Sequence, residues 1–221
     1  MKLYSSPMSI ISKGIDEVGL PPELTPILAK LTHTRRGWEK RGVNEEGTME
    51  DARQHVAKLD LAAQAINVEA FDVDRIILRT QLLVHELPEL INPDYTPGEI
   101  SLEEKMRIER ESIQKALPVG FPRREEIIQH WEDYEKGGLA YLLDKMDAVV
   151  TAYYYAVVNP KEYAKVAAEF HQHALARVKD PRLLLILEDI REAVIQGGLT
   201  RTTIFPYYFE MLRMIKGGRS S

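Results

Sequence analysis

Residues 139–158, with the sequence LAYLLDKMDAVVTAYYYAVV, form the most apolar of the helices expected in this chain and decide its fold class. Apolar residues on nearly every side are typical of a helix buried in a protein core. Asp144, Lys145 and Asp147 interrupt the pattern, and the two aspartates, three residues apart, share one face. A buried carboxylate needs a cation, which a basic side chain or a metal ion could supply. Alternatively, Asp144 and Lys145 lie at the edge of the helix.

Apolar residues with helical spacing extend from this stretch in both directions. Upstream, Ser101 and Glu104 form a capping box before an amphipathic helix, and Pro88 is expected to end or kink the helix before it. Helices are predicted for 23–31, from 49 onward, and for 72–84, 101–117, 121–134, 160–178, 181–196 and 203–216. Because alternating patterns and hairpin turns are nearly absent, we expect an all-α fold: a single helical domain of about seven to nine helices over residues 1–221.

Composition excludes several classes of protein. The chain has 221 residues, a formal net charge of −5 and no cysteine. Disulfides, thiolate nucleophiles and cysteine-ligated metals are therefore excluded, and a binding partner among nucleic acid polymers is not expected. The longest aliphatic run, Leu183–Leu187, is far too short for a membrane span, and the N-terminal residues do not resemble a signal peptide. We expect a cytoplasmic protein without a membrane partner.

Two of the six histidines stand out. His33, His130, His171 and His173 are typical of exposed or capping residues, whereas His55 and His85 lie in apolar helical segments. His85 precedes Glu86 in the sequence LLVHELPE, and burying such a pair is costly unless it is paired or binds a ligand. A satisfied core histidine is the alternative for His85. Together, His55, His85, Glu86 and Asp144 offer two imidazoles and two carboxylates, which suit a divalent ion such as Mn²⁺, Co²⁺, Mg²⁺, Zn²⁺ or Fe²⁺.

An ordered set of motifs resembles the HD-domain metal-dependent phosphohydrolases, and within them the 5′-deoxynucleotidase branch. The set begins with Arg35-Arg36-Gly37-Trp38, continues with Arg41-Gly42-Val43 and Glu50-Asp51-Ala52-Arg53-Gln54-His55, and includes His85-Glu86-Leu87-Pro88-Glu89, Pro93-Asp94-Tyr95-Thr96-Pro97 and Asp144-Lys145. The resemblance covers residues of about 24–156, which would form the motif-bearing core, while 160–216 would add C-terminal helices.

The resemblance implies a role for each matching residue. His55, His85 and Asp144 match the family's metal ligands, and Glu86 stands where the family has the aspartate of its His-Asp pair. The resemblance also implies that Glu89 orients or deprotonates the attacking water. Three further positions match the substrate site: Arg35 or Arg36 would hold the phosphate, Trp38 would lie near the sugar or phosphate, and Asp94 would contact the sugar hydroxyl.

The expected function is therefore metal-dependent release of phosphate from a small phosphomonoester, most specifically a deoxynucleoside 5′-monophosphate, by a homodimer. Glutamate is one methylene longer than aspartate, so the His-Glu pair favours a second interpretation. In it, a catalytically degenerate HD-domain protein binds a nucleotide or a protein partner. An HD-type di-iron oxygenase and a plain helical interaction module are the remaining alternatives.

Overall fold

The structure, a computed structural model, describes residues 22–34, 36–43, 49–92, 95 and 99–216. These residues form nine α-helices and five short 3-10 helices, and no β-strand occurs among them. The all-α prediction is confirmed. The described residues also contain no helix that is both long and apolar enough to cross a membrane.

The chain divides into two compact units, each built from segments that are separate in the sequence. The first, here called the α2–α6 unit, consists of the described residues among 22–60 and 76–140. The second, the α7–α10 unit, consists of residues 61–75 and 141–216. The prediction of one domain over 1–221 is not tested by this division and stays a prediction.

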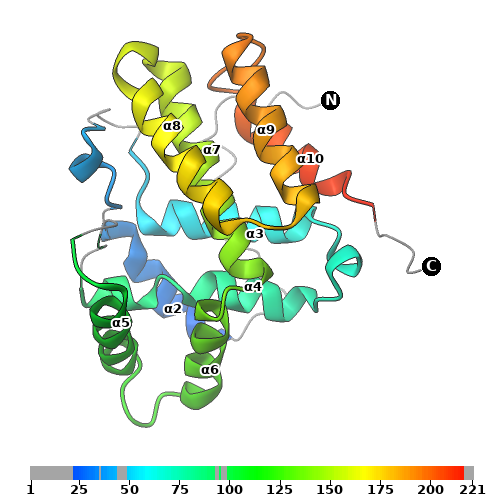
Figure 1. Ribbon diagram of the computed structural model, residues 1–221. Helices are drawn as coiled ribbons and strands as arrows, with labels where there is room; N and C mark the ends of the chain where they lie inside the picture. Colours follow the sequence, from blue (N-terminus) through cyan, green and yellow to red (C-terminus); the bar gives the residue numbers. More distant parts are fainter. Residues whose placement is uncertain (1–21, 35, 44–48, 93–94, 96–98, 217–221) are drawn as a thin grey trace. The chain divides into compact units, whose positions relative to one another are not determined.

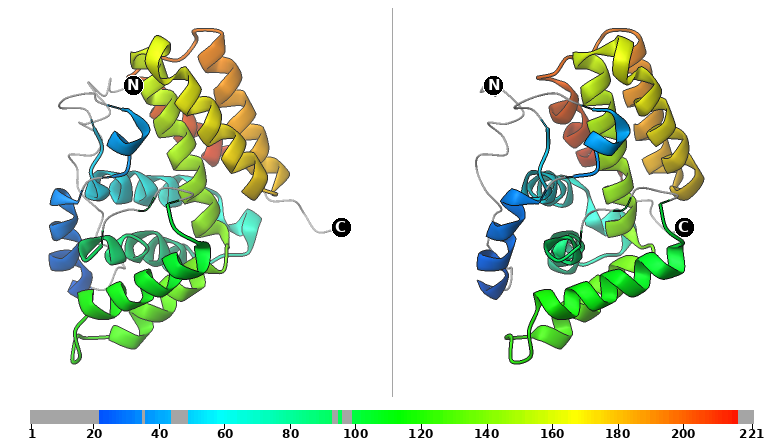
Figure 2. Two further views of the ribbon diagram at one scale, coloured as in Figure 1. Left: turned by 60° about the vertical axis from the view of Figure 1, so that its left-hand side comes forward. Right: turned by 90° about the vertical axis from the view of Figure 1, so that its left-hand side faces the viewer.

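The α2–α6 unit holds its helices around an aliphatic core. Its elements are η1 (Pro22–Leu24), α2 (Thr25–Leu28), η2 (Ala29–His33), η3 (Glu39–Arg41), the first part of α3 (Ala52–Ala65), most of α4 (Arg75–Val84), η5 (Leu87–Leu90), α5 (Leu102–Ala116) and α6 (Arg124–Glu135). Leu31, Val56, Leu83 and Ile113 are fully buried in this core, which Trp131 closes on the α6 side. Figures 1 and 2 show α5 and α6 side by side, joined by a short loop.

Capping fixes where the helices of this unit begin. Asp51 Oδ1 accepts a hydrogen bond from the backbone N–H of Gln54 at 2.7 Å, and the Gln54 side chain accepts one from the Asp51 N–H at 3.0 Å. This reciprocal pair starts α3 at Ala52, three residues after the predicted start. The predicted cap of α5 is confirmed, because Ser101 Oγ accepts from the Glu104 N–H at 3.1 Å.

Pro88 ends α4 as predicted. A proline ring clashes with the carbonyl group four residues earlier, which here belongs to Val84, the last residue of α4. The chain continues through a turn at His85 and Glu86 into η5. Because of Pro88, His85 and Glu86 lie in a turn directly after the C-terminal end of α4 and not in regular helix.

The α7–α10 unit contains η4 (Val68–Phe71), nearly all of α7 (Leu139–Val158), α8 (Pro160–Arg177), α9 (Pro181–Ile195) and α10 (Ile204–Arg213). Prolines at the start of α8 and α9 suit helix N-termini, where no N–H is needed. Figure 1 shows α7, α8 and α9 as neighbouring helices joined by short turns. The prediction that His171 is an exposed or capping histidine is wrong. Its side chain follows Tyr163 and Ala167 on the buried face of α8, and the residue is only 2% exposed.

Candidate metal centre

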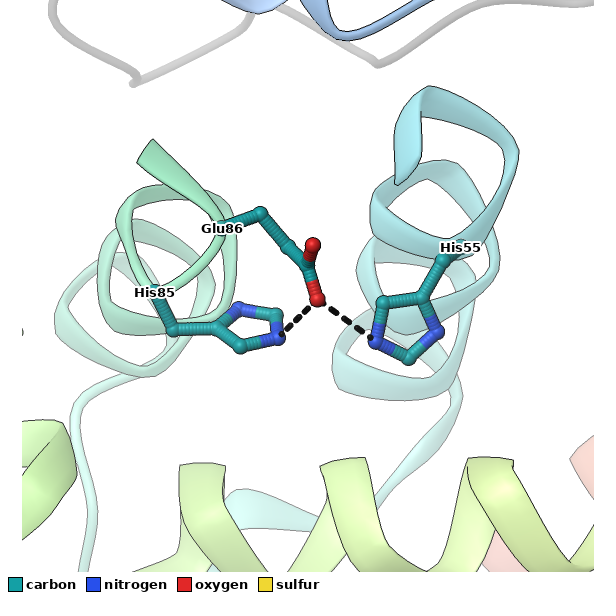
Figure 3. Close-up of side chains that lie close together, drawn as sticks. All are labelled: His55, His85 and Glu86. Carbon is teal, nitrogen blue, oxygen red and sulfur yellow. Dashed lines mark ion pairs between the residues drawn. The ribbon is translucent and has the colours of Figure 1, made fainter. Parts of the chain in front are cut away.

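Three of the four predicted metal ligands lie together in the α2–α6 unit. His55 extends from α3, and His85 and Glu86 come from the turn after α4 (Figure 3). The Nε2 atoms of His55 and His85 lie 3.4 and 3.1 Å from the same Glu86 oxygen, Oε1. All three side chains are buried, so these groups form a convergent set of nitrogen and oxygen atoms that is shielded from solvent.

The outer nitrogen of each imidazole also has a neighbour. His85 Nδ1–H donates to the Leu82 carbonyl oxygen at 2.7 Å, so Nε2 is the ring atom that could bind a metal ion. His55 Nδ1 lies 3.2 Å from Glu50 Oε1. A carboxylate or carbonyl on the outer nitrogen is the usual partner of a metal-bound histidine, because it fixes the tautomer and the ring orientation.

Glu50 is itself held by a buried cation. Lys58 Nζ lies 3.0 Å from Glu50 Oε2, and the Lys58 side chain is 3% exposed. Burial alone would raise the pKa of Glu50, but the charge of Lys58 and the interaction with His55 outweigh it and lower that pKa to about 2. Glu50 is therefore ionised at neutral pH and can orient His55.

Arg36 dominates the electrostatics on the other side of the site. Its Nη1 atom forms an ion pair with Glu86 Oε1 and lies 3.7 Å from Glu89 Oε1. Burial opposes ionisation of Glu86, but Arg36, His85 and His55 together hold the pKa of Glu86 well below its usual range. Glu86 is thus anionic at neutral pH, although it is fully enclosed.

The residues present fit a divalent ion. Glu86 Oε2 is buried and has no hydrogen-bond partner among the residues that the structure describes, which is uncommon for a carboxylate oxygen inside a protein. The ligand atoms of His55, His85 and Glu86 lie within 4.8 Å of one another. Two imidazole nitrogens and an ionised carboxylate would hold Mn²⁺, Co²⁺, Fe²⁺ or Zn²⁺ more readily than a soft cation.

The fourth predicted ligand, Asp144, belongs to the α7–α10 unit. It is 4% exposed, and its Oδ2 atom accepts a hydrogen bond from Lys145 Nζ at 2.7 Å. Its location on the buried side of α7 argues against the alternative position at the helix edge. Its assignment as a ligand stays a prediction.

The predicted substrate residues are only partly described. Trp38 is buried and leads into η3, while Glu89 lies in η5 beside Arg36. Arg35 and Asp94 lie outside the described residues. Of the two arginines that the resemblance matched to the phosphate, Arg36 is the one that the structure describes, and it lies in the site.

Three further residues belong to the site and were not predicted. Glu50 and Lys58 support His55, and the ring of Tyr134 lies 4.7 Å from that of His85. Glu50 occurs in the motif, but the motif gives it no role. One feature of the sequence could have indicated Lys58: it is a lysine in an otherwise apolar helical stripe, three residues after His55.

Comparison with known proteins agrees with this geometry. Residues 28–182, well over half of the chain, match the family described as HD domain. A curated relative, "5′-deoxynucleotidase HDDC2" of Dictyostelium discoideum, is 28% identical over 144 residues, which are 60% of this chain and 76% of the relative. The family match at residues 28–182 includes His55, His85 and Asp144. The family and the relative both support a metal-dependent phosphohydrolase as the general class of activity. The chain therefore belongs to the HD-domain family.

Proposed function

We propose that this protein releases phosphate from deoxynucleoside 5′-monophosphates in a reaction that depends on a divalent ion. The observation that carries the proposal is the convergence of His55 Nε2, His85 Nε2 and Glu86 at one buried point, with the outer nitrogens beside a carbonyl and a carboxylate. The name of the Dictyostelium relative, a 5′-deoxynucleotidase, supports the choice of substrate class.

A divalent ion bound by these residues would lower the pKa of a water molecule and polarise a phosphoryl oxygen. The protein's own groups would do the rest. Arg36 carries the positive charge that a phosphate dianion needs, and guanidinium–phosphate contacts are among the stronger hydrogen bonds in proteins. Glu89, with its carboxylate 3.7 Å from Arg36, is placed to accept a proton next to the bound phosphate.

The proposed reaction breaks one P–O bond and forms another. As the water oxygen bonds to phosphorus, its proton passes to the Glu89 carboxylate. The bond between phosphorus and the 5′ oxygen then breaks, and that oxygen takes the proton from Glu89 as the deoxynucleoside leaves. Positioning and electrostatic stabilisation provide most of the catalysis in such phosphoryl transfers.

The test is phosphate release from a panel of ribo- and deoxynucleoside 5′-monophosphates, with Mn²⁺, Co²⁺, Mg²⁺ or EDTA added. We expect release that requires a metal and favours the deoxy substrates. His85→Ala and Glu89→Gln should each lower kcat at least 100-fold, because one removes a ligand and the other the proton acceptor. His130→Ala, in α6, is the matched control and should retain full activity. Metal-dependent turnover that persists in His85→Ala would contradict the site assignment.

The ion pair between Arg36 and Glu86 favours a second candidate, the degenerate HD-domain protein. In this candidate, the guanidinium supplies the cation that Glu86 requires, and the site binds a nucleotide without hydrolysing it. Calorimetric titration with a deoxynucleoside monophosphate separates the two functions. Binding that EDTA leaves unchanged, together with the absence of phosphate release, would favour the second candidate.

A further inference from the structure

The metal ligand His85 receives little support from regular secondary structure. The helix α4 ends at Val84, so His85 lies in the turn that follows it. Its Nδ1–H donates to the Leu82 carbonyl oxygen at 2.7 Å, but an imidazole held by one hydrogen bond can still pivot about that bond. A contact on the face of the ring would remove this freedom. It would keep Nε2 directed toward Glu86, as Figure 3 shows it.

Tyr134 of α6 supplies such a contact. The centroid of its ring lies 4.7 Å from that of His85, and the two ring planes are inclined by 34°. Favourable pairs of aromatic rings have centroids about 4.5–7 Å apart, so this pair is a close one. The small inclination places the rings nearer to a stacked than to an edge-on arrangement. Tyr134 is only 4% exposed, and close packing around a buried ring restricts the positions that it can take.

The end of α6 fixes the position of Tyr134. Gly137 has a φ of +86°, and its N–H donates to the Tyr134 carbonyl oxygen at 3.0 Å. A left-handed glycine of this kind ends a helix at a definite residue. One turn before Tyr134, Trp131 is anchored in the aliphatic core of the α2–α6 unit. The backbone that carries the Tyr134 ring is therefore held on both sides along the chain.

We propose that Tyr134 is a positioning residue for the metal centre: its ring packs against His85 and holds the imidazole in the plane that directs Nε2 toward Glu86. The other imidazole has different support, because His55 extends from regular helix and its Nδ1 lies 3.2 Å from the Glu50 carboxylate. The role belongs to the ring of Tyr134, since the contact joins two rings. The inference rests on the proposed function, which needs the metal ion, but not on the choice of substrate.

The test is Mn²⁺ binding to the full chain, measured by isothermal titration calorimetry without substrate. Tyr134→Leu keeps an apolar side chain but removes the flat ring. We expect it to bind Mn²⁺ about 10-fold more weakly than wild type, as when other groups behind a metal ligand are lost. Tyr134→Phe keeps the ring and should bind within about 2-fold of wild type. Equal affinities in Tyr134→Leu and wild type would overturn the inference, and so would an equal loss in Tyr134→Phe.

A matched control separates positioning from a loss of stability. Ile128→Ala removes a buried side chain of the same helix from the aliphatic core. It should lower Tm, because it leaves a cavity, and bind Mn²⁺ normally. If it weakened Mn²⁺ binding as much as Tyr134→Leu, destabilisation of α6 would account for both results and the inference would be wrong. If circular dichroism shows that Tyr134→Leu is unfolded, Tyr134→Met replaces it, because its flexible side chain fills space without a flat face.

The visible absorption spectrum of bound Co²⁺ reports the arrangement of the ligands directly. At saturating Co²⁺, the bands of Tyr134→Leu should differ from those of wild type, because the His85 ring is no longer held in its plane. The spectra of Tyr134→Phe and Ile128→Ala should match wild type. An unchanged spectrum in Tyr134→Leu would overturn the assigned role.

The same measurements distinguish this inference from the proposed function. A wild-type protein that binds Mn²⁺ but releases no phosphate would contradict the proposed function alone, and the Tyr134 variants would still decide the inference. A wild-type protein that binds neither Mn²⁺ nor Co²⁺ would overturn both.

Discussion

Lys58 supports the orientation of His55 through Glu50. It is a buried lysine paired with Glu50, and Glu50 in turn lies beside His55 Nδ1. Removing the lysine would leave the Glu50 carboxylate buried without its strongest cation, which is unfavourable. The carboxylate would then move or take up a proton and cease to hold the imidazole in place.

We therefore expect Lys58→Met to weaken Mn²⁺ binding by about 10- to 100-fold, as is usual when a group behind a metal ligand is lost. Isothermal titration calorimetry would measure the dissociation constant. Lys58→Arg should recover most of the affinity, because it restores the positive charge. Lys115→Met, on the exposed side of α5, is the matched control and should bind normally. Equal affinities in Lys58→Met and wild type would show that Lys58 does not support the site.

This site shows what residue patterns can and cannot predict. The spacing of His55 and of the His85–Glu86 pair was enough to name them as candidates, because imidazoles in apolar helices are costly without a partner. The choice between Arg35 and Arg36 could not be made, since adjacent residues in a loop point in directions that depend on tertiary packing. The same holds for Lys58, whose role appears only once Glu50 is placed next to it.

At the scale of helices, α9 begins at a cap that also pairs with an arginine. Asp180 Oδ1 accepts a hydrogen bond from the Arg182 backbone N–H at 2.9 Å, and both carboxylate oxygens accept bonds from the Arg182 guanidinium. Asp180→Ala should destabilise the protein by about 1 kcal/mol, the usual value of an N-cap. Urea unfolding measures this loss, and Glu192→Ala, at an exposed position in α9, should show little change.

The charge of Asp180 adds a dependence on pH. The hydrogen bonds from Arg182 hold the pKa of Asp180 below its ordinary value of 3.8, despite partial burial. The stabilisation from its charge is therefore complete above pH 3.8 and declines as the pH falls through the lowered pKa. Asp180→Asn keeps a capping oxygen but loses this charge. Its deficit in unfolding free energy should be present at pH 7 and smaller at pH 3; a deficit that grows at low pH would contradict the sign.

A buried ion pair joins α3 and α4 within the α2–α6 unit. Arg79 donates from Nε to Asp60 Oδ1 at 2.7 Å and from Nη2 to Asp60 Oδ2 at 3.3 Å, and both residues are buried. Asp60→Leu should cost about 3–5 kcal/mol, because it removes the carboxylate that pairs with a buried guanidinium. The double variant Asp60→Leu/Arg79→Met should be more stable than Asp60→Leu in urea unfolding. Additive losses would show that the two residues do not act as a pair.

Helix boundaries were predictable where one local interaction decides them. Pro88 and Ser101 set an end and a start that agree with the structure. The start of α3 was placed three residues early, because Met49, Glu50 and Asp51 continue a helical pattern. Asp51 is instead the cap, in a reciprocal pair with Gln54. The Ala52 N–H also donates to the Thr34 carbonyl oxygen at 3.0 Å, a contact with a distant part of the chain that no local pattern predicts.

At the scale of the whole molecule, no sequence pattern predicted the division into two units. No proline- or serine-rich linker separates them, since the chain passes from one to the other within α3 and α7 and at the start of α4. Within the α7–α10 unit, distant segments are joined by specific contacts. Arg182 Nη1 donates to the Ala70 carbonyl at 2.6 Å, and Asn67 Nδ2 donates to that of Ile215 at 3.2 Å. Such pairings have no signature in composition or periodicity.

Two whole-molecule properties stay predictions, namely the homodimer that the resemblance implies and the cytoplasmic location. Sedimentation velocity at several protein concentrations tests the first. A mass of twice 25.3 kDa that is independent of concentration would support it, and a monomer throughout would contradict it.

The proposed metal site should also couple to the stability of the folded protein. A ligand that binds only the folded state stabilises it by RT ln(1 + [L]/Kd), which is about 2.7 kcal/mol when its concentration is 100 times Kd. For a chain of this size, that free energy corresponds to a rise in Tm of about 5–10 °C. We expect Mn²⁺ to produce such a rise in a thermal unfolding experiment and EDTA to reverse it.

His85→Ala should unfold at the same temperature with and without Mn²⁺, because it lacks one of the three convergent ligands. His130→Ala should respond like wild type, so an equal rise in both variants would place the binding of Mn²⁺ elsewhere on the protein.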